Sequence, residues 1–279
     1  MFRRVICPNC QTRIDDASYT CPVCNHKFEK NRKNRAITLV PFWKQIVLFL
    51  VGFLFFQVFA TVFSIIVQSI ALMEYGAGTF AYYNFVYSVK SSALINFISY
   101  FVVFGVLSAL LIADAHELTK SFKNWRPVVA GLIGLGAILL FNMIYNSILS
   151  ITGMTLTDNA NENSLNSIVS QYPILSLVVF GVVGPICEEI TYRVGLFSFF
   201  NRINKILAYV LTIIVFAFIH FDFASSTIIN ELLNMPLYGF AAFVFCYLYD
   251  RYGFAGSLYA HVSNNVLSIA TTIIGQIGR

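Results

Sequence analysis

The sequence predicts an all-α polytopic membrane protein with a small zinc knuckle or zinc ribbon at its N-terminus. Hydrophobic residues make up 58% of the 279 residues and charged residues only 11%, whereas about a quarter of a soluble domain is charged. The mean hydropathy is +0.73, and long apolar runs follow one another along most of the chain. Two pairs of closely spaced cysteines precede the first of these runs.

The cysteine pairs predict a cytoplasmic zinc-ribbon-like module with a basic linker over residues 1–35. The motifs CPNC and CPVC contain Cys7, Cys10, Cys21 and Cys24. Each pair can turn tightly and present two sulfurs to one tetrahedral structural zinc ion. Reduced cytoplasmic thiols favour metal over disulfides, with redox-active or unligated thiols as the alternative. Cys187 and Cys246 lie in apolar runs and are expected to be small buried hydrophobic residues.

The rest of the chain is predicted to lie in the membrane, as N-terminal transmembrane helices over 36–127 and a core over 128–279. A crossing needs about 20 apolar residues. We expect about seven spans, or eight if part of the aromatic stretch 74–92 re-enters the membrane. The predicted spans cover residues 45–73, 93–113, 128–153, 172–200, 205–222, 229–249 and 254–275.

The distribution of basic residues predicts a multi-pass protein of the cell membrane with a cytoplasmic N-terminus. Nine of the 18 basic residues lie between Arg3 and Lys44, and Lys and Arg beside a first span favour the cytoplasmic side. No cleavable signal peptide is expected, because the first forty residues are polar and basic. The run Lys30–Arg35 is explained by this anchoring role, so nucleic acid is not an expected partner.

Basic residues in the later loops agree with this topology. The loop 114–127 and the turns at 202–205 and 250–251 fall on the same side as the N-terminus and carry most of the remaining Lys and Arg. The acidic stretch 155–164 falls on the opposite side. The bias of Lys and Arg toward one side is the signature of the positive-inside rule.

Charged side chains in the predicted spans mark a functional site, because each costs about 2.5–3.5 kcal/mol at a helix centre. Glu189 and Arg193 are spaced i,i+4 and are predicted to form an ion pair on one helix face. The adjacent Glu188 points about 100° away and needs a partner from another helix, a proton or water. His220 and His261 lie in two later spans, and each taken alone is typical of a hydrogen-bonded core histidine.

Helix geometry brings these residues together. A hairpin turning near Asn204 would place Glu188 and His220 at equal depth, about 24 Å from the turn, with His261 at about 15 Å. Glu188 and His220 could then activate a water molecule. Donors from His261 and from Asn265, one turn further on beside Asn264, could stabilise an oxyanion. The alternative is a catalytic zinc ion bound by Glu188, His220 and His261.

Three motifs carry a resemblance to a known family. EEITYR fits EExxxR, FAFIH fits FxxxH and HVSNN fits HxxxN, and they occur in that order in the C-terminal half. In this arrangement the sequence resembles the CAAX protease and bacteriocin-processing (CPBP) family of intramembrane proteases, over about residues 130–275. The resemblance implies a catalytic core over 128–279 with Glu188 as general base and His220 as its partner. It implies supporting roles for Glu189 and Arg193, and an oxyanion hole formed by His261 and Asn265.

The resemblance implies an intramembrane endopeptidase that acts on a peptide or membrane-protein substrate from the lipid bilayer. Both a metalloprotease mechanism and a metal-free, glutamate-dependent mechanism are associated with the family. The alternative function is a non-proteolytic scaffold or bacteriocin-immunity protein that binds peptides in the same cavity. A transporter that uses buried carboxylates is a further alternative, although the sequence shows no internal repeats. Asn230, Glu231 and Asn234 are polar residues near the sixth span to which no role is assigned.

Overall fold

The structure, a computed structural model, describes residues 4–7, 9–15, 21, 23–24, 26 and 40–277. The predicted basic linker around Lys30–Arg35 lies outside these residues. The first described segment is a hairpin of the antiparallel strands β1 (Arg4–Ile6) and β2 (Arg13–Asp15), in which Val5 pairs with Ile14. The described residues from Val40 onward are almost entirely helical.

The helices form an N-terminal group and a C-terminal core. The N-terminal group consists of α2 (Phe42–Leu50), η1 (Val51–Phe55), α3 (Phe56–Tyr75), α4 (Phe80–Val86), α5 (Val89–Leu111), α6 (Ala115–Thr119) and η2 (Lys120–Lys123). The core consists of α7 (Trp125–Ile151), α8 (Ala160–Gln171), α9 (Pro173–Val178), η3 (Val179–Val183), α10 (Gly184–Glu188), η4 (Glu189–Phe197), α11 (Ser198–Asn201), α12 (Lys205–Phe218), α13 (Ile228–Tyr252) and α14 (Phe254–Ile277).

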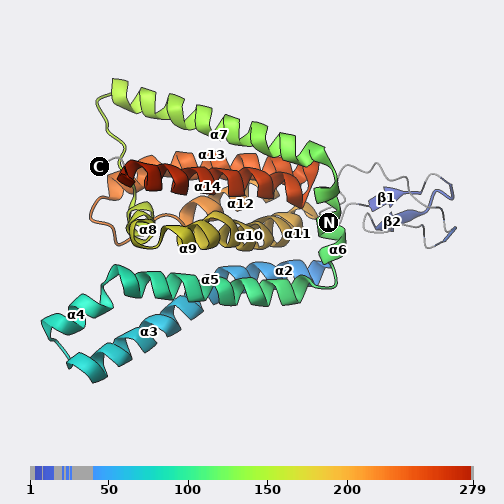
Figure 1. Ribbon diagram of the computed structural model, residues 1–279. Coiled ribbons are helices and arrows are strands. Elements are labelled where there is room, and N and C mark those ends of the chain that lie inside the picture. The colour runs from blue at the N-terminus through green and yellow to red at the C-terminus, as the bar shows by residue number, and fades with distance from the viewer. Residues whose placement is uncertain are drawn as a thin grey trace.

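The long helices lie roughly side by side (Figure 1). The continuous helix from α9 to α11, called the central helix here, lies with α12, α13 and α14 in the middle of the bundle. Helix α7 packs along α13 and α14, while α2 crosses η4 on the other flank. Small residues allow this close approach: a Cβ at Gly131 of α7 would lie 3.0 Å from the backbone nitrogen of Ala260 in α14. Such small-residue contacts are typical of helix packing in membranes.

The prediction of an all-α polytopic membrane protein is confirmed. Five helical segments among the described residues are long and apolar enough to cross a membrane: Phe42–Tyr75, Phe80–Leu111, Trp125–Ile151, Pro173–Asn201 and Ile228–Tyr252. Helix α12 is apolar but has only 14 residues, and α14 packs against α7 and α13. The count of seven or eight spans stays a prediction.

Polar caps begin the helices at the positions where an apolar run is interrupted. The side chains of Thr79, Ser88, Asn124, Asn159 and Asn204 each accept a hydrogen bond from a backbone N–H in the first turn of the helix that follows. These caps satisfy N–H groups that a helix leaves unpaired. They explain why the aromatic stretch 74–92 is mostly helical, since α4 and α5 begin directly after two of them.

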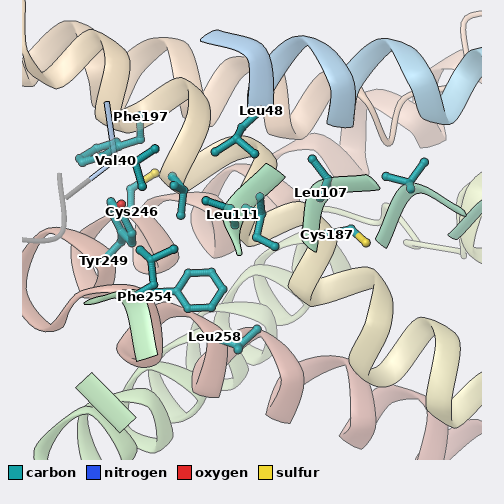
Figure 2. Packing of buried hydrophobic residues seen from close by; sticks show 14 of the residues in the cluster. Val40, Leu48, Leu107, Leu111, Cys187, Phe197, Cys246, Tyr249, Phe254 and Leu258 are labelled. Atoms are coloured by element: carbon teal, nitrogen blue, oxygen red, sulfur yellow. The ribbon is translucent and has the colours of Figure 1, made fainter. Parts of the chain in front are cut away.

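The largest described core cluster joins the two groups of helices. Leu48 of α2, Leu107 of α5 and Phe197 of η4 converge with Tyr249 of α13 and Leu258 of α14 (Figure 2). Cys187 and Cys246 belong to the same cluster; both thiols are free and buried. The prediction that these two cysteines are small buried hydrophobic residues is therefore confirmed.

Basic and acidic side chains tie the helices together at the end of the bundle where α2 begins. Lys44 forms an ion pair with Asp114 at 2.6 Å, and Lys205 forms one with Asp250. Arg202 donates a hydrogen bond of 3.0 Å to the carbonyl of Val40. The loops that the sequence placed on one side of the membrane thus lie at one end of the molecule. That this end faces the cytoplasm stays a prediction.

Candidate active site

The central helix places two adjacent carboxylates in the interior of the bundle. Two π-helical segments, η3 and η4, flank the short α10 that ends at Glu188. Pro185 in α10 has no N–H to donate, and π-helical turns accommodate such a break in the hydrogen-bond ladder and occur at functional sites. A π-helix also rises less per residue, which reduces the depth difference that the sequence predicted between Glu188 and His261.

Glu189 and Arg193 form the predicted intrahelical ion pair. The Nη1 of Arg193 lies 3.1 Å from the Oε1 of Glu189, and both side chains are fully buried. The guanidinium also stacks against two aromatic rings, 4.5 Å from the centroid of Phe216 and 5.1 Å from that of Phe245. Aromatic faces stabilise a guanidinium that has lost its water.

His261 of α14 lies between the two glutamates. Its Nδ1 is 2.8 Å from the Oε1 of Glu189, and its Nε2 is 3.6 Å from the Oε2 of Glu188. Because Glu189 is paired with Arg193 as a carboxylate, the Nδ1–H of His261 is the donor of this bond. The sequence paired Glu188 with His220 across a hairpin, whereas the structure also brings His261 to Glu188.

His220 lies just beyond α12, in the turn that follows Phe218. The predicted span 205–222 is thus shorter as a helix, although the hairpin turn near Asn204 is where the sequence placed it. The Nδ1 of His220 is 2.8 Å from the carbonyl oxygen of Phe216, to which it donates. The ring stacks on Tyr238 with 4.3 Å between centroids and 14° between planes. The remaining nitrogen, Nε2, is then a free acceptor.

Glu188, His220, His261 and Asn265 line one cavity of about 520 Å³. The side chain of Glu188 is 17% exposed, whereas that of Glu189 is 0% exposed. This difference separates the two carboxylates: Glu188 can meet a bound molecule, and Glu189 supports the residues around it. Asn265 donates from Nδ2 to the carbonyl of Phe180 at 3.1 Å, which fixes its carboxamide at the wall.

Carboxamides dominate the polar part of the cavity wall. They come from Gln57, Asn96, Asn142, Asn161, Asn166, Asn234, Asn264 and Asn265. The described wall residues include the carboxylates Glu162 and Glu188 but no Lys or Arg. Burial, reinforced by the neighbouring Asp158, raises the pKa of Glu162. Carboxamides donate and accept hydrogen bonds, so such a wall suits the amide groups of a peptide.

The four N-terminal cysteines form a cluster suited to a metal ion. The sulfur-to-sulfur distance is 3.7 Å between Cys7 and Cys24 and 3.4 Å between Cys10 and Cys21. All four ligand atoms lie within 4.8 Å of one another, and all four thiols are free. Zn–S bonds of about 2.3 Å in a tetrahedron place sulfurs about 3.8 Å apart. The cluster therefore fits a structural zinc ion.

The two cysteine pairs have the same backbone turn. The N–H of Cys7 donates to the carbonyl of Thr12, and the N–H of Cys21 donates to that of His26, five residues later in each case. Hydrogen bonds from Thr12 lower the pKa of Cys10 to about 6. Burial raises the pKa of Cys21 to about 11. Zinc would have to displace the proton of Cys21 in order to bind.

A catalytic zinc ion has less geometric support. Among the described residues, the four cysteines are the group of three or more potential ligands that converges closely enough to hold an ion. Glu188, His220 and His261 do not form such a group as they stand. The described geometry therefore does not hold these three side chains ready for a catalytic zinc ion.

Sequence reasoning missed three residues around His220. Tyr238 stacks on its ring, Asn159 binds its backbone carbonyl, and Glu231 binds the backbone of the same loop. Asn159 and Tyr238 lie outside the three sequence motifs, so no pattern linked them to His220. The unassigned polar patch at 230–234 was a visible signal for Glu231 alone.

The fold and the cavity define a multi-pass membrane protein with ionisable side chains gathered in its interior. Comparison with known proteins finds a similarity in one segment: residues 170–267 match the family described as Rce1-like, Type II CAAX prenyl endopeptidase Rce1-like. This segment is similar to that family. It contains all of the predicted site residues from Glu188 to Asn265.

The UPF0177 protein YvdC of Lactococcus lactis subsp. lactis (strain IL1403) is a relative. It is 23% identical over 180 residues, which cover 63% of this chain and 66% of the relative. The aligned segment thus spans just under two thirds of the relative's length. No solved structure matches the chain.

Proposed function

We propose that the protein is an intramembrane endopeptidase in which Glu188 and His220 activate water for attack on a peptide bond. The observation that carries this proposal is the exposure of Glu188 to the same cavity as His220, His261 and Asn265. The similarity of residues 170–267 to the Rce1-like endopeptidase family supports peptide hydrolysis as the reaction class.

Glu188 is the general base. Its carboxylate takes a proton from water while the oxygen of that water attacks the carbonyl carbon of the substrate. The free Nε2 of His220 accepts a hydrogen bond from the same water and orients it. Glu188 then passes the proton to the leaving amide nitrogen, so that the C–N bond breaks to give a carboxylic acid and an amine.

The oxyanion is stabilised by Asn265 and His261. One N–H of the Asn265 carboxamide is used on Phe180, and the second is available. His261 donates its Nδ1–H to Glu189, so its Nε2 can donate only when the imidazole carries both protons. An imidazolium at His261 would also bring the net charge of the site to zero, because the two negative charges of Glu188 and Glu189 exceed the single positive charge of Arg193 by one.

The cavity wall favours an internal peptide segment as substrate. Among the described wall residues there is no Lys or Arg, and the charge of a His261 imidazolium is already offset by the two glutamates, so a free C-terminal carboxylate would meet Glu162 and Glu188 without an unpaired cation. The carboxamides of the wall instead suit the uncharged amides of an extended chain. We therefore favour a peptide or membrane-protein substrate over a prenylated C-terminus.

The proposal is tested with purified full-length protein in detergent or liposomes and a fluorogenic membrane-peptide reporter. Glu188→Gln and His220→Ala should each lower kcat by about 100-fold or more, the scale of a lost acid–base group. Glu74→Gln, an exposed carboxylate on α3, serves as the matched control and should retain full activity. Cleavage by Glu188→Gln at the wild-type rate would overturn the mechanism.

Two further measurements separate the alternatives. If the wild type binds the reporter as tightly as Glu188→Gln does but cleaves none of it, the protein is the scaffold or immunity protein. For the metal, chelation is applied to the wild type and to the double variant Cys7→Ser/Cys21→Ser. Loss of cleavage in both would support a catalytic zinc ion at Glu188, His220 and His261, whereas full activity in both would support the glutamate-dependent mechanism.

A further inference from the structure

The turn that carries His220 is held by a buried polar network from two other helices. Asn159, the N-cap of α8, is 1% exposed and donates from Nδ2 to the backbone carbonyl of His220 at 3.0 Å. Its Oδ1 accepts the N–H of Glu162 at 2.9 Å, which caps α8. One side chain thus fixes both the start of α8 and the position of His220.

Glu231 extends the network from α13. Its side chain is 1% exposed, and both carboxylate oxygens accept backbone N–H groups. Oε1 accepts from Ala160 at 2.9 Å, and Oε2 accepts from Asp222 at 3.2 Å. Because Ala160 follows Asn159 and Asp222 lies two residues after His220, Glu231 clamps the same two segments that Asn159 joins.

Tyr238 completes the network two turns further along α13. Its ring stacks on His220 at 4.3 Å, and its hydroxyl lies 3.4 Å from the Oδ1 of Asn159. With Nδ1 bound to Phe216, the His220 ring is thus fixed at one face, at one nitrogen and at its backbone. A histidine in a turn would otherwise sample several rotamers.

We infer that Asn159, Glu231 and Tyr238 are positioning residues that hold the imidazole of His220 toward Glu188, with α8 as part of the catalytic framework. The inference rests on the proposed function. None of the three needs to touch the scissile bond: Asn159 and Glu231 act on the backbone, and Tyr238 acts on the ring. Displacement of a reacting group by about 1 Å can cost about 100-fold in rate.

The chain offers conservative variants that separate positioning from folding. Asn159→Asp keeps the oxygen that caps α8 but loses the donor to His220. Glu231→Gln keeps the shape but replaces one acceptor oxygen with an amide. Tyr238→Phe keeps the stacking, whereas Tyr238→Leu removes it. Asn163→Ala is the control, because Asn163 binds the carbonyl of Asp158 at the same helix end without reaching His220.

The measured quantities are kcat, KM and the unfolding temperature of each full-length variant. Asn159→Asp, Glu231→Gln and Tyr238→Leu should lower kcat by about 10- to 100-fold, with KM changed by less than about threefold and with a folded fraction like that of the control. Tyr238→Phe should retain most of the activity. Variants that unfold at lower temperature but keep the wild-type kcat would show a purely structural role and overturn the inference.

A second readout does not depend on catalysis. Diethyl pyrocarbonate modifies an imidazole nitrogen, and mass spectrometry of the His220 peptide gives its rate. Modification should be several-fold faster in Asn159→Asp and Tyr238→Leu than in wild type and Asn163→Ala. Unchanged modification rates in both variants would overturn the inference even if Glu188→Gln abolishes cleavage. Faster modification in both variants, together with a wild type that cleaves no reporter, would support the positioning network but contradict the proposed function.

Discussion

The central helix and the first span are both apolar, yet they lie in different surroundings. The mean hydropathy of the most apolar part is 1.8 for Pro173–Asn201 and 2.6 for Phe42–Tyr75. In the central helix 61% of that part is buried inside the protein, against 6% in the first span. Length and hydropathy predict that a helix crosses the membrane, but they do not say whether its side chains meet lipid or protein.

The position of the charged residues separates the two helices, because those of the first span, Lys44 and Glu74, lie near its ends. The first span exposes large apolar side chains such as Val58 and Ile65, which are 54% and 57% exposed. The central helix contains Glu188, Glu189 and Arg193, and the last two have no exposed surface. Ionisable residues in hydrocarbon are expensive unless other helices surround and pair them. In this chain the helix with charged residues in its middle is accordingly the enclosed one.

The largest effect is expected for Arg193→Ala. Removal of the guanidinium leaves Glu189 buried without its cation, and breaking a buried pair costs about 3–5 kcal/mol. Cleavage should be lost as well, because Glu189 holds His261. Thermal unfolding in detergent and the reporter assay measure the two losses.

The double variant Glu189→Gln/Arg193→Met controls for the charge. It should recover part of the stability, since neither charge is then left alone, but it should not recover cleavage. If Arg193→Ala were as stable as wild type, the enclosed character assigned to the central helix would be wrong.

A smaller effect is expected where the two helices touch. A Cβ at Gly52 would lie 1.8 Å from the Oγ1 of Thr191 in η4. Gly52→Ala should therefore destabilise the protein by about 1–3 kcal/mol through overpacking. The matched control is Gly105→Ala in α5, because a Cβ there meets nothing within 4 Å. Equal unfolding temperatures for the two variants would contradict the close contact.

A still smaller effect is expected on the lipid-facing side of the first span. Ile65→Ala should change the free energy of unfolding in the membrane by less than about 0.5 kcal/mol, as surface substitutions away from special features do. Ile138→Ala in α7, where the side chain is 1% exposed, should cost about 2–5 kcal/mol. Unfolding measurements that ranked the two variants in the opposite order would contradict the burial pattern.

The smallest effect on the membrane core is expected from removal of zinc from the four-cysteine cluster. Chelation or Cys7→Ser should unfold the N-terminal module while the unfolding temperature of the helices stays unchanged. Zinc affinity should fall as pH falls, because the metal must displace thiol protons, above all that of Cys21 with its pKa raised to about 11. Competition with a zinc indicator between pH 6 and 8 checks the direction, and a pH-independent affinity would contradict it.

The sequence predicted those contacts that depend on spacing within one segment. Glu189 and Arg193 lie one helical turn apart, and the two CxxC turns present their sulfurs together. Both follow from local geometry. The helices of the bundle could likewise be predicted from apolar runs of membrane length. The residues at which the helices begin could not, because each start depends on a single hydrogen bond from a cap such as Asn159 or Thr79.

Contacts between helices were less accessible to sequence reasoning. A uniform rise of 1.5 Å per residue left His261 short of the depth of Glu188, because the π-helical turns of η4 have no recognised sequence signal. The stack of Tyr238 on His220 depends on how α13 is rotated relative to α12. Neither hydropathy nor motif spacing contains that rotation.

The link between the last two helices has a consequence for biosynthesis. Gly253, with a φ of 75°, separates α13 from α14, a left-handed conformation that glycine adopts without strain. Helix α14 carries His261, Asn264 and Asn265 and is not among the five described segments apolar enough to cross a membrane alone. We therefore expect α13 and α14 to insert as one hairpin, so that the candidate site residues of α14 enter the bilayer together with the neighbouring helix.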